Sequence, residues 1–186
     1  LKNTGLTVQD CDAAAVAAGP GSFTGIRIGV SAAKGLAFAA DKPCAAVSTL
    51  EAMARNVAHM DALVVCAMDA RRSQIYTALF TSEHGRLTRR TPDRAIGLAE
   101  LAEELRSEPL PLVIVGDGAV LCEKALTESG LPCRLAPPQL VMQNAMSVAL
   151  CAEDLARAGK LVSAQELLPV YLRPPQAQRL RQPPQI

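Results

Sequence analysis

The chain has 186 residues, of which 49% are hydrophobic and only 3% aromatic, and its net charge is +1. This length allows one large or two small domains with a substantial core. Because Trp is absent, that core must consist mainly of closely packed Ala, Leu and Val. The balanced charge argues against a strongly basic nucleic-acid surface, and the lack of an 18-residue apolar run predicts no membrane-spanning helix.

The cysteines indicate a reducing environment. None of the six forms a Cys-x-x-Cys pair, and several lie in apolar stretches: Cys11, Cys44, Cys66, Cys122, Cys133 and Cys151. We therefore expect buried free thiols and not a disulfide framework or a zinc site. With no secretory pattern at the start of the sequence, the expected location is the cytoplasm.

The first 60 residues predict alternating strands and helices. A buried strand over residues 12–18 leads into the turn Gly19-Pro20-Gly21-Ser22-Phe23-Thr24-Gly25, where Ser22 or Thr24 can cap the next helix. That helix is predicted over residues 25–40, with a second strand at 44–47 and a second helix, opened by the Ser48-x-x-Glu51 capping box, to about residue 58. This order favours a parallel sheet.

The remaining residues predict a different order, in which an antiparallel meander precedes the parallel crossovers. Strands are predicted at 62–68, 74–81 and 87–91, then helix 98–107, strand 112–115, helix 119–128, strand 133–135 and helix 144–158. Residues 174–186 are rich in Pro and Gln and are expected to be a disordered tail.

These two orders together predict a duplicated α/β fold. The order over residues 61–173 is that of a ribonuclease-H-like domain, and residues 1–60 correspond to the back half of the same unit. We therefore expect a first copy that lacks its N-terminal strands and helix, about 50 residues. A parallel sheet left with two strands would have an exposed edge.

The predicted helix over residues 25–40 has more apolar surface than one sheet can cover. Arg27, Ser31 and Lys34 fall on one narrow strip together with Phe38, and most other positions are apolar or very small. Two explanations remain open. The helix is either buried inside one domain, or it lies between its own sheet and a partner chain.

The stretch GPGSFTGIRIGVSAAKGLAFA resembles the TsaB (YeaZ) family, which is supported by Val47–Leu50, Met68–Arg71, Gly116–Gly118 and Leu168–Arg173. The resemblance covers roughly residues 5–173. It implies an actin/Hsp70-like (ASKHA) duplicated architecture and a non-catalytic scaffold subunit of the machinery that adds threonylcarbamoyl to N6 of adenosine in tRNA. The implied partners are a catalytic TsaD-type subunit, a TsaE-type ATPase and a second copy when the chain is alone, with tRNA reached only through the complex.

This resemblance, together with the small side chains, places the partner interface on the predicted helix. The expected contact residues are Gly25, Ile26, Gly29, Val30, Ala32, Ala33, Leu36 and Ala37. Ser22, Thr24, Arg27 and Lys34 are candidate contacts to an anion or to the rim of the partner. We expect no cofactor of its own, with ATP or ADP at most at the interface with partner subunits.

A hydrolase is the alternative function. A ribonuclease-H-like nuclease needs carboxylates that hold two metal ions, and Asp69, Glu103 (or Glu100) and Asp117 occupy suitable places in the sequence. A metallopeptidase of the M22 type needs a metal-binding histidine pair, whereas His59 and His84 lie 25 residues apart. We therefore expect neither a metal site nor catalytic residues, and we expect Arg71 and Arg173 to have structural or inter-domain roles.

Overall fold

The computed structural model describes residues 3–71 and 73–173. The expected disordered tail, residues 174–186, lies outside the described residues. None of the described helices is long and apolar enough to cross a membrane.

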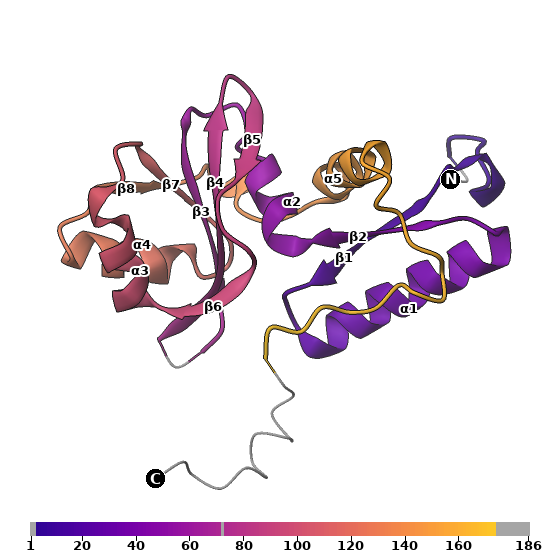
Figure 1. The fold of residues 1–186 in the computed structure, drawn as a ribbon, viewed down its shortest axis with the longest axis horizontal. Coiled ribbons are helices and arrows are strands. Elements are labelled where there is room, and N and C mark those ends of the chain that lie inside the picture. The colour runs from indigo at the N-terminus through magenta and orange to yellow at the C-terminus, as the bar shows by residue number, and fades with distance from the viewer. Residues whose placement is uncertain (1–2, 72, 174–186) are drawn as a thin grey trace, which may run out of the picture.

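The first sheet is a parallel pair of strands, β1 (Ala14–Gly19) and β2 (Cys44–Ser48), joined by helix α1 (Phe23–Ala40). Helix α1 covers one face of this sheet, and α5 (Ala145–Arg157) and α2 (Thr49–Arg55) lie on the other (Figure 1). In the described part of the chain, β1 pairs with β2 and with no other strand. The predicted parallel β-α-β unit is confirmed, and one edge of β1 carries no strand.

The second sheet has six strands in the order β5-β4-β3-β7-β8, with β6 also paired to β4. Strands β3, β4 and β5 form an antiparallel meander, whereas β7 and β8 are parallel to β3. The strands are β3 (Ala62–Asp69), β4 (Gln74–Glu83), β5 (Arg86–Arg89), β6 (Arg94–Gly97), β7 (Leu112–Val115) and β8 (Cys133–Leu135).

Helices cover both faces of the second sheet. Helices α3 (Leu98–Glu104) and α4 (Ala119–Glu128) bury Leu101 and Leu126 against one face, together with Ile114 of β7. On the other face, Leu50 and Met53 of α2 pack against strand residues. Short 3-10 turns at Val8–Asp10, Leu105–Ser107 and Pro138–Leu140 complete the described elements. Each core consists mainly of aliphatic side chains, as the composition predicts.

Most predicted elements are present, but some bounds differ. The helix after Ser48 ends at Arg55 and not near residue 58, although Ser48 Oγ accepts from the Glu51 N–H as predicted. The short strand Arg94–Gly97 is absent from the prediction because its alternation covers only four residues. It is held by pairing with β4, a contact that local sequence does not reveal.

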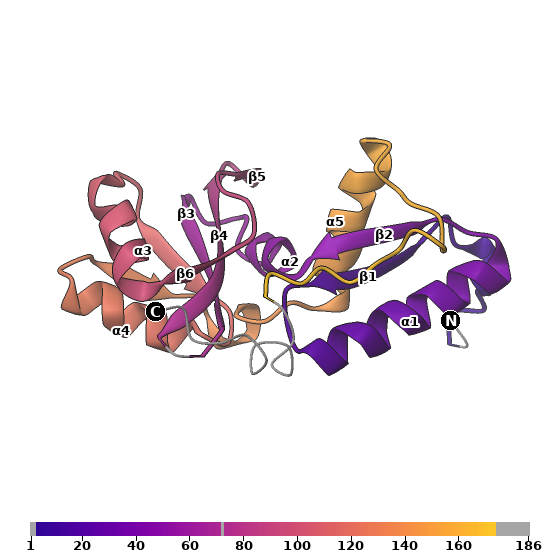
Figure 2. The same ribbon diagram turned by 60° about the horizontal axis from the view of Figure 1, so that its bottom comes forward.

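The C-terminal part of the described chain returns to the first sheet. After β8, helix α5 packs on β1 and β2, and the segment that follows α5 runs along α1 (Figures 1 and 2). A boundary at residue 60 therefore does not separate the two sheets completely, because helix α5 and the segment after it, which were expected in the second unit, pack on the first sheet.

Candidate functional site: the exposed face of helix α1

The glycine turn before α1 is shaped by close contact with the chain's own backbone. Gly19 has φ 137°, and a Cβ at this position would lie 2.2 Å from the carbonyl oxygen of Val170. The Val170 N–H donates to the Ala18 carbonyl oxygen at 2.7 Å. The C-terminal segment thus occupies the side of the turn at Gly19 and leaves no room there for a ligand.

Ser22 begins helix α1. Its Oγ accepts a hydrogen bond from the Gly25 N–H at 3.3 Å, which satisfies one of the free donors of the first turn. The sequence analysis offered Ser22 or Thr24 for this role, and the structure selects Ser22. Because the capping residue is Ser22, the helix begins at the next residue, Phe23, and not at Gly25. Thr24 is exposed on the first turn.

One face of α1 is buried by its own chain. This corrects the expectation that all eight interface residues face a partner, because four of them line the core of the first sheet. They pack with Val16 of β1 and Leu167 of the C-terminal segment, and their side chains are at most 9% exposed: Ile26, Val30, Ala33 and Ala37. The helical repeat of 3.6 residues places these four on one arc directed at the sheet.

The opposite face of α1 is exposed and apolar. Ile28 is 67% exposed and Leu36 is 55% exposed, although either side chain would be stabilised by about 1.5–3 kcal/mol if it were fully buried. Gly25 and Ala32, both in the expected interface, are exposed as well, and Gly29 is half-buried beside Val16. Figure 2 shows that α1 lies at the border of the molecule.

The sequence analysis missed part of this exposed face. Ile28 was not selected, and Phe38, which is 68% exposed, was grouped with the polar strip. The helical repeat contained the missing signal, because Ile28 lies about 160° around the helix from Ile26 and Val30. The helical repeat separates the two apolar arcs of the helix, but it does not predict which of them faces outward.

The two cations of α1 contact the chain's own C-terminal segment. Lys34 Nζ donates to the carbonyl oxygens of Gln165 and Leu167, at 2.9 and 3.3 Å. Arg27 Nε donates to the Tyr171 hydroxyl at 3.1 Å, and its guanidinium lies 4.3 Å from the centre of the Phe23 ring. Both side chains thus have partners within the chain, although Arg27 is exposed and Lys34 is half-buried. Their role as contacts to an external anion or partner stays a prediction.

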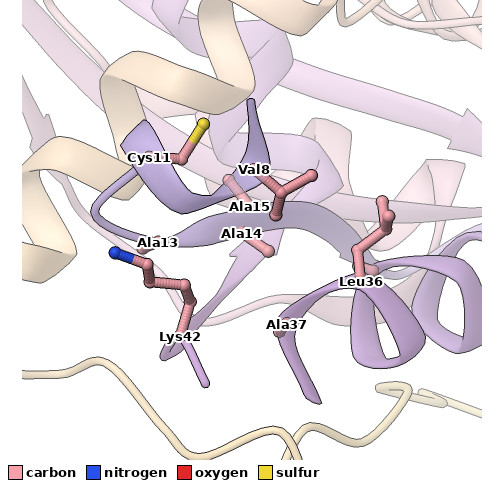
Figure 3. A pocket seen from close by; sticks show the side chains of 9 residues that line it. Val8, Cys11, Ala13, Ala14, Ala15, Leu36, Ala37 and Lys42 are labelled. Atoms are coloured by element: carbon pink, nitrogen blue, oxygen red, sulfur yellow. The ribbon is translucent and has the colours of Figure 1, made fainter. Parts of the chain in front are cut away.

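A small apolar cavity of about 210 Å³ lies between the N-terminal 3-10 turn, β1 and α1 (Figure 3). Three residues from the expected interface, Ala33, Leu36 and Ala37, line it. Lys42 is the one cationic side chain in a lining otherwise made of Val8, Cys11, Ala13, Ala14, Ala15, Ala33, Leu36 and Ala37. A lining with so few polar groups supplies no acid, base or nucleophile pair for catalysis.

The three carboxylates of the nuclease alternative are not brought together. Asp69 and Asp117 are neighbours, because Asp117 Oδ1 accepts from the Asp69 N–H at 3.1 Å. Glu103 instead pairs with Arg106 on the exposed face of α3. Among the described residues, no three His, Cys, Asp or Glu side chains are placed to hold a metal ion, and His59 and His84 are both exposed.

The cysteines are free thiols, and four of the six are buried. Burial raises the pKa of the Cys122 thiol to about 12, and a smaller contribution comes from neighbouring Cys133. Burial likewise raises the pKa of Cys66, whose Sγ donates to the Leu50 carbonyl oxygen. Thiols held neutral in this way are poor nucleophiles, so these two cysteines serve packing.

The arrangement matches that of known proteins. A family model described as TsaD, tRNA N6-adenosine threonylcarbamoyltransferase, matches residues 1–168. A crystal structure titled as an uncharacterized protein with similarity to peptidase YEAZ, from Pseudomonas aeruginosa, superimposes with a TM-score of 0.79 at 26% identity, covering 92% of this chain and 78% of that chain. A second structure, YeaZ from the same organism, gives 0.77 at 25% identity, with coverages of 92% and 79%. These matches define a mixed α/β protein of the TsaD-like class.

Two curated relatives define the family more narrowly. The TsaB protein of Escherichia coli is 33% identical over 177 residues, which is 93% of this chain and 75% of that protein. The TsaB protein of Bacillus subtilis is 39% identical over 128 residues, 69% of this chain and 56% of the relative. Both are named tRNA threonylcarbamoyladenosine biosynthesis proteins. The chain belongs to the TsaB (YeaZ) family.

Proposed function

We propose that this protein is a non-catalytic scaffold subunit in the biosynthesis of threonylcarbamoyladenosine in tRNA, and that it binds a TsaD-type catalytic subunit through the outward face of α1. One observation carries the proposal: an 18-residue helix buries one arc in its own core and leaves large apolar side chains exposed on another. In water such a face is most stable when a partner covers it.

The size and shape of α1 suit a helix-packing interface. Eighteen residues correspond to a helix about 27 Å long. Gly25, Gly29 and Ala32 leave a flank with little side-chain volume near the start of α1, which lets a second helix approach closely there. Leu36 lies further along the same flank, and Ile28 lies on the arc beside it. A specific interface buries more than about 1,000 Å², so the partner must also reach residues outside α1.

The same face is proposed to form a homodimer when the TsaD-type subunit is absent, since two copies can pack their small-residue flanks together. A TsaE-type ATPase would join the assembled complex, and tRNA would be bound only there. We propose no cofactor for the chain alone and place any ATP or ADP at the interface with partner subunits. The free thiols suit the reducing cytoplasm.

We also propose that the two sheets are related units of a duplicated, ribonuclease-H-like (ASKHA) fold. In both units a strand leads into a glycine with positive φ, followed by a helix and a further parallel strand: Gly19 is the last residue of β1, and Gly116 directly follows β7. In the second unit, β3 pairs with the other edge of β7. By this analogy, the free edge of β1 would take a parallel strand.

The hydrolase alternative gains no support from any specific contact, because the carboxylate set that it requires is divided between two surfaces. We therefore assign the chemistry to the TsaD-type partner and not to this chain.

Two substitutions of matched exposure test the proposed interface. Ile28→Glu on α1 and Val120→Glu on α4 both replace an exposed β-branched residue, 67% and 68% exposed. Both variants should unfold within about 0.5 kcal/mol of wild type. We expect Ile28→Glu to weaken binding to a TsaD-type subunit by roughly tenfold or more and to disrupt any homodimer, whereas Val120→Glu should bind normally.

Binding is measured by titration calorimetry and oligomeric state by light scattering after gel filtration. Equal affinity of Ile28→Glu and wild type would refute the assignment of the interface to α1. Ala33→Glu is not a suitable test, because Ala33 is 9% exposed and faces the core.

A further inference from the structure

The last described residues form a separate feature, which we call the C-terminal clasp (residues 162–173). The clasp begins at the edge of β2, where Val162 and Cys44 exchange two backbone hydrogen bonds of 2.9 and 2.7 Å. From there it follows α1 toward the second sheet (Figures 1 and 2). Ala164 and Leu167 are buried in the core of the first sheet and anchor its first half.

The middle of the clasp is held by contacts with α1 and β1. The ammonium group of Lys34 bridges two clasp carbonyls, those of Gln165 and Leu167. The Val170 N–H donates to Ala18, and the missing side chain of Gly19 allows Val170 to approach the strand. These contacts fix the clasp to both elements that flank the glycine turn.

The end of the clasp joins the first sheet to the second. The Tyr171 ring lies 5.0 Å from that of Phe23 at the start of α1. Two residues later, Arg173 Nη1 donates to the Ala70 carbonyl oxygen at 3.0 Å, and Nη2 donates to Gln74 Oε1. Ala70 lies in the turn between β3 and β4, and Gln74 is the first residue of β4, so Arg173 makes an inter-domain contact of the kind expected from the sequence.

That turn is itself under backbone strain. Arg71 and Ser73 have φ values of 63° and 56°, in the left-handed region that non-glycine residues adopt only at a cost. The Arg71 N–H donates to Asp69 Oδ1 at 2.6 Å, and Arg173 satisfies the neighbouring Ala70 carbonyl. The clasp thus ends on a turn whose conformation depends partly on tertiary contacts.

We infer that the clasp opens and closes as one unit, and that its closed form fixes the position of α1 relative to the β3–β4 turn. Its outer half buries little apolar surface, because Leu168, Val170 and Tyr171 are 65%, 44% and 37% exposed. Segments held mainly by a few hydrogen bonds open at a lower free energy than the core does. The contacts at Lys34 and Arg173 therefore act on the same equilibrium.

The clasp would also regulate binding, an extension that rests on the proposed function. A partner that covers α1 in its fixed position binds the closed form more tightly and so stabilises it. By thermodynamic linkage, a change that lowers the closed fraction of the clasp must weaken partner binding by the same factor. Lys34 and Arg173 would then be positioning residues that act through α1 and do not touch the partner.

Hydrogen exchange of the full chain, read by nuclear magnetic resonance, tests the clasp without any partner. The variants are Lys34→Met and Arg173→Met, with Lys124→Met and Arg157→Met as controls at cations exposed by 74% and 70%. In both clasp variants the Val170 amide should exchange about tenfold faster, since each loses two hydrogen bonds. Both controls should match wild type, and amides of β3 in each variant report on overall folding.

The pattern of exchange decides the inference. If Lys34→Met affects only amides near Gln165 and Arg173→Met affects only those near Ala70, the contacts are independent and the clasp is not a unit. If the Val170 amide exchanges faster in both variants, the clasp opens as a unit.

Hydrogen exchange in the presence of a saturating TsaD-type subunit tests the coupling. Because the partner binds the closed form more tightly, the Val170 amide should exchange at least tenfold more slowly in the complex than in the free chain. Unchanged exchange of the Val170 amide in the complex would overturn the coupling. Absence of binding by the wild-type chain would count against the proposed function and the coupling, while the exchange pattern would still decide whether the clasp opens as a unit.

Discussion

Gly116 should be one of the positions least tolerant of a single added methyl group. It directly follows β7 with φ 111°, and a Cβ there would lie 2.1 Å from the carbonyl oxygen of Ala67 on the neighbouring strand β3. The same oxygen accepts from the Gly118 N–H at 3.0 Å, so the two backbones cannot separate without losing a buried hydrogen bond. The glycine is required by close packing of backbone on backbone.

The cost of Gly116→Ala has two parts. The left-handed backbone conformation costs an alanine about 1–2 kcal/mol, and relief of the overlap with Ala67 adds about 1–3 kcal/mol, as for other overpacked sites. Gly130 provides the matched control, because its φ is 78° and no other atom lies within 4 Å of a Cβ built there. Gly130→Ala should therefore cost only the first part.

Urea unfolding followed by circular dichroism gives both free energies. We expect Gly116→Ala to lose about 2–5 kcal/mol of unfolding free energy and Gly130→Ala about 1–2 kcal/mol. A difference below about 0.5 kcal/mol between the two variants would refute the argument, because it would mean that the close approach of β7 and β3 costs nothing to disturb.

Three further predictions concern other parts of the fold. The unfolding free energy should fall as pH rises above 9, because the unfolded chain releases the thiol proton that folded Cys122 retains to a pKa of about 12; in Cys122→Ala, compared by urea unfolding at pH 8 and pH 10, the fall should be smaller. Arg89→Met removes ion pairs of 2.6 Å to Glu51 of α2 and to the nearby Asp93 and should cost about 1 kcal/mol, less in 1 M salt; an equal loss at both salt concentrations would contradict an electrostatic origin. Gly35→Ala, on the exposed face of α1 with no atom within 4 Å of the new Cβ, should raise the unfolding free energy by about 0.5–1 kcal/mol; thermal unfolding would show a lower midpoint if that position were not open.

Local residue order was sufficient to predict most of the secondary structure. The glycine turn and the cap at Ser48 lie directly before the helices that they begin, so the sequence predicts the start of each helix closely. The parallel β1-α1-β2 unit followed from the alternation of strand and helix patterns. Strand β6 did not follow, since four residues carry too little pattern without the pairing to β4.

The tertiary structure alone decided which arc of α1 faces outward and what the cations of α1 contact. Both arcs of this helix are apolar, so the helical repeat could not distinguish Val30, which faces β1, from Ile28, which faces outward. Lys34 is 131 residues away from the carbonyl oxygen of Gln165 that it binds. Contacts over such separations depend on how the chain returns after α5, and no local pattern of side chains encodes that path.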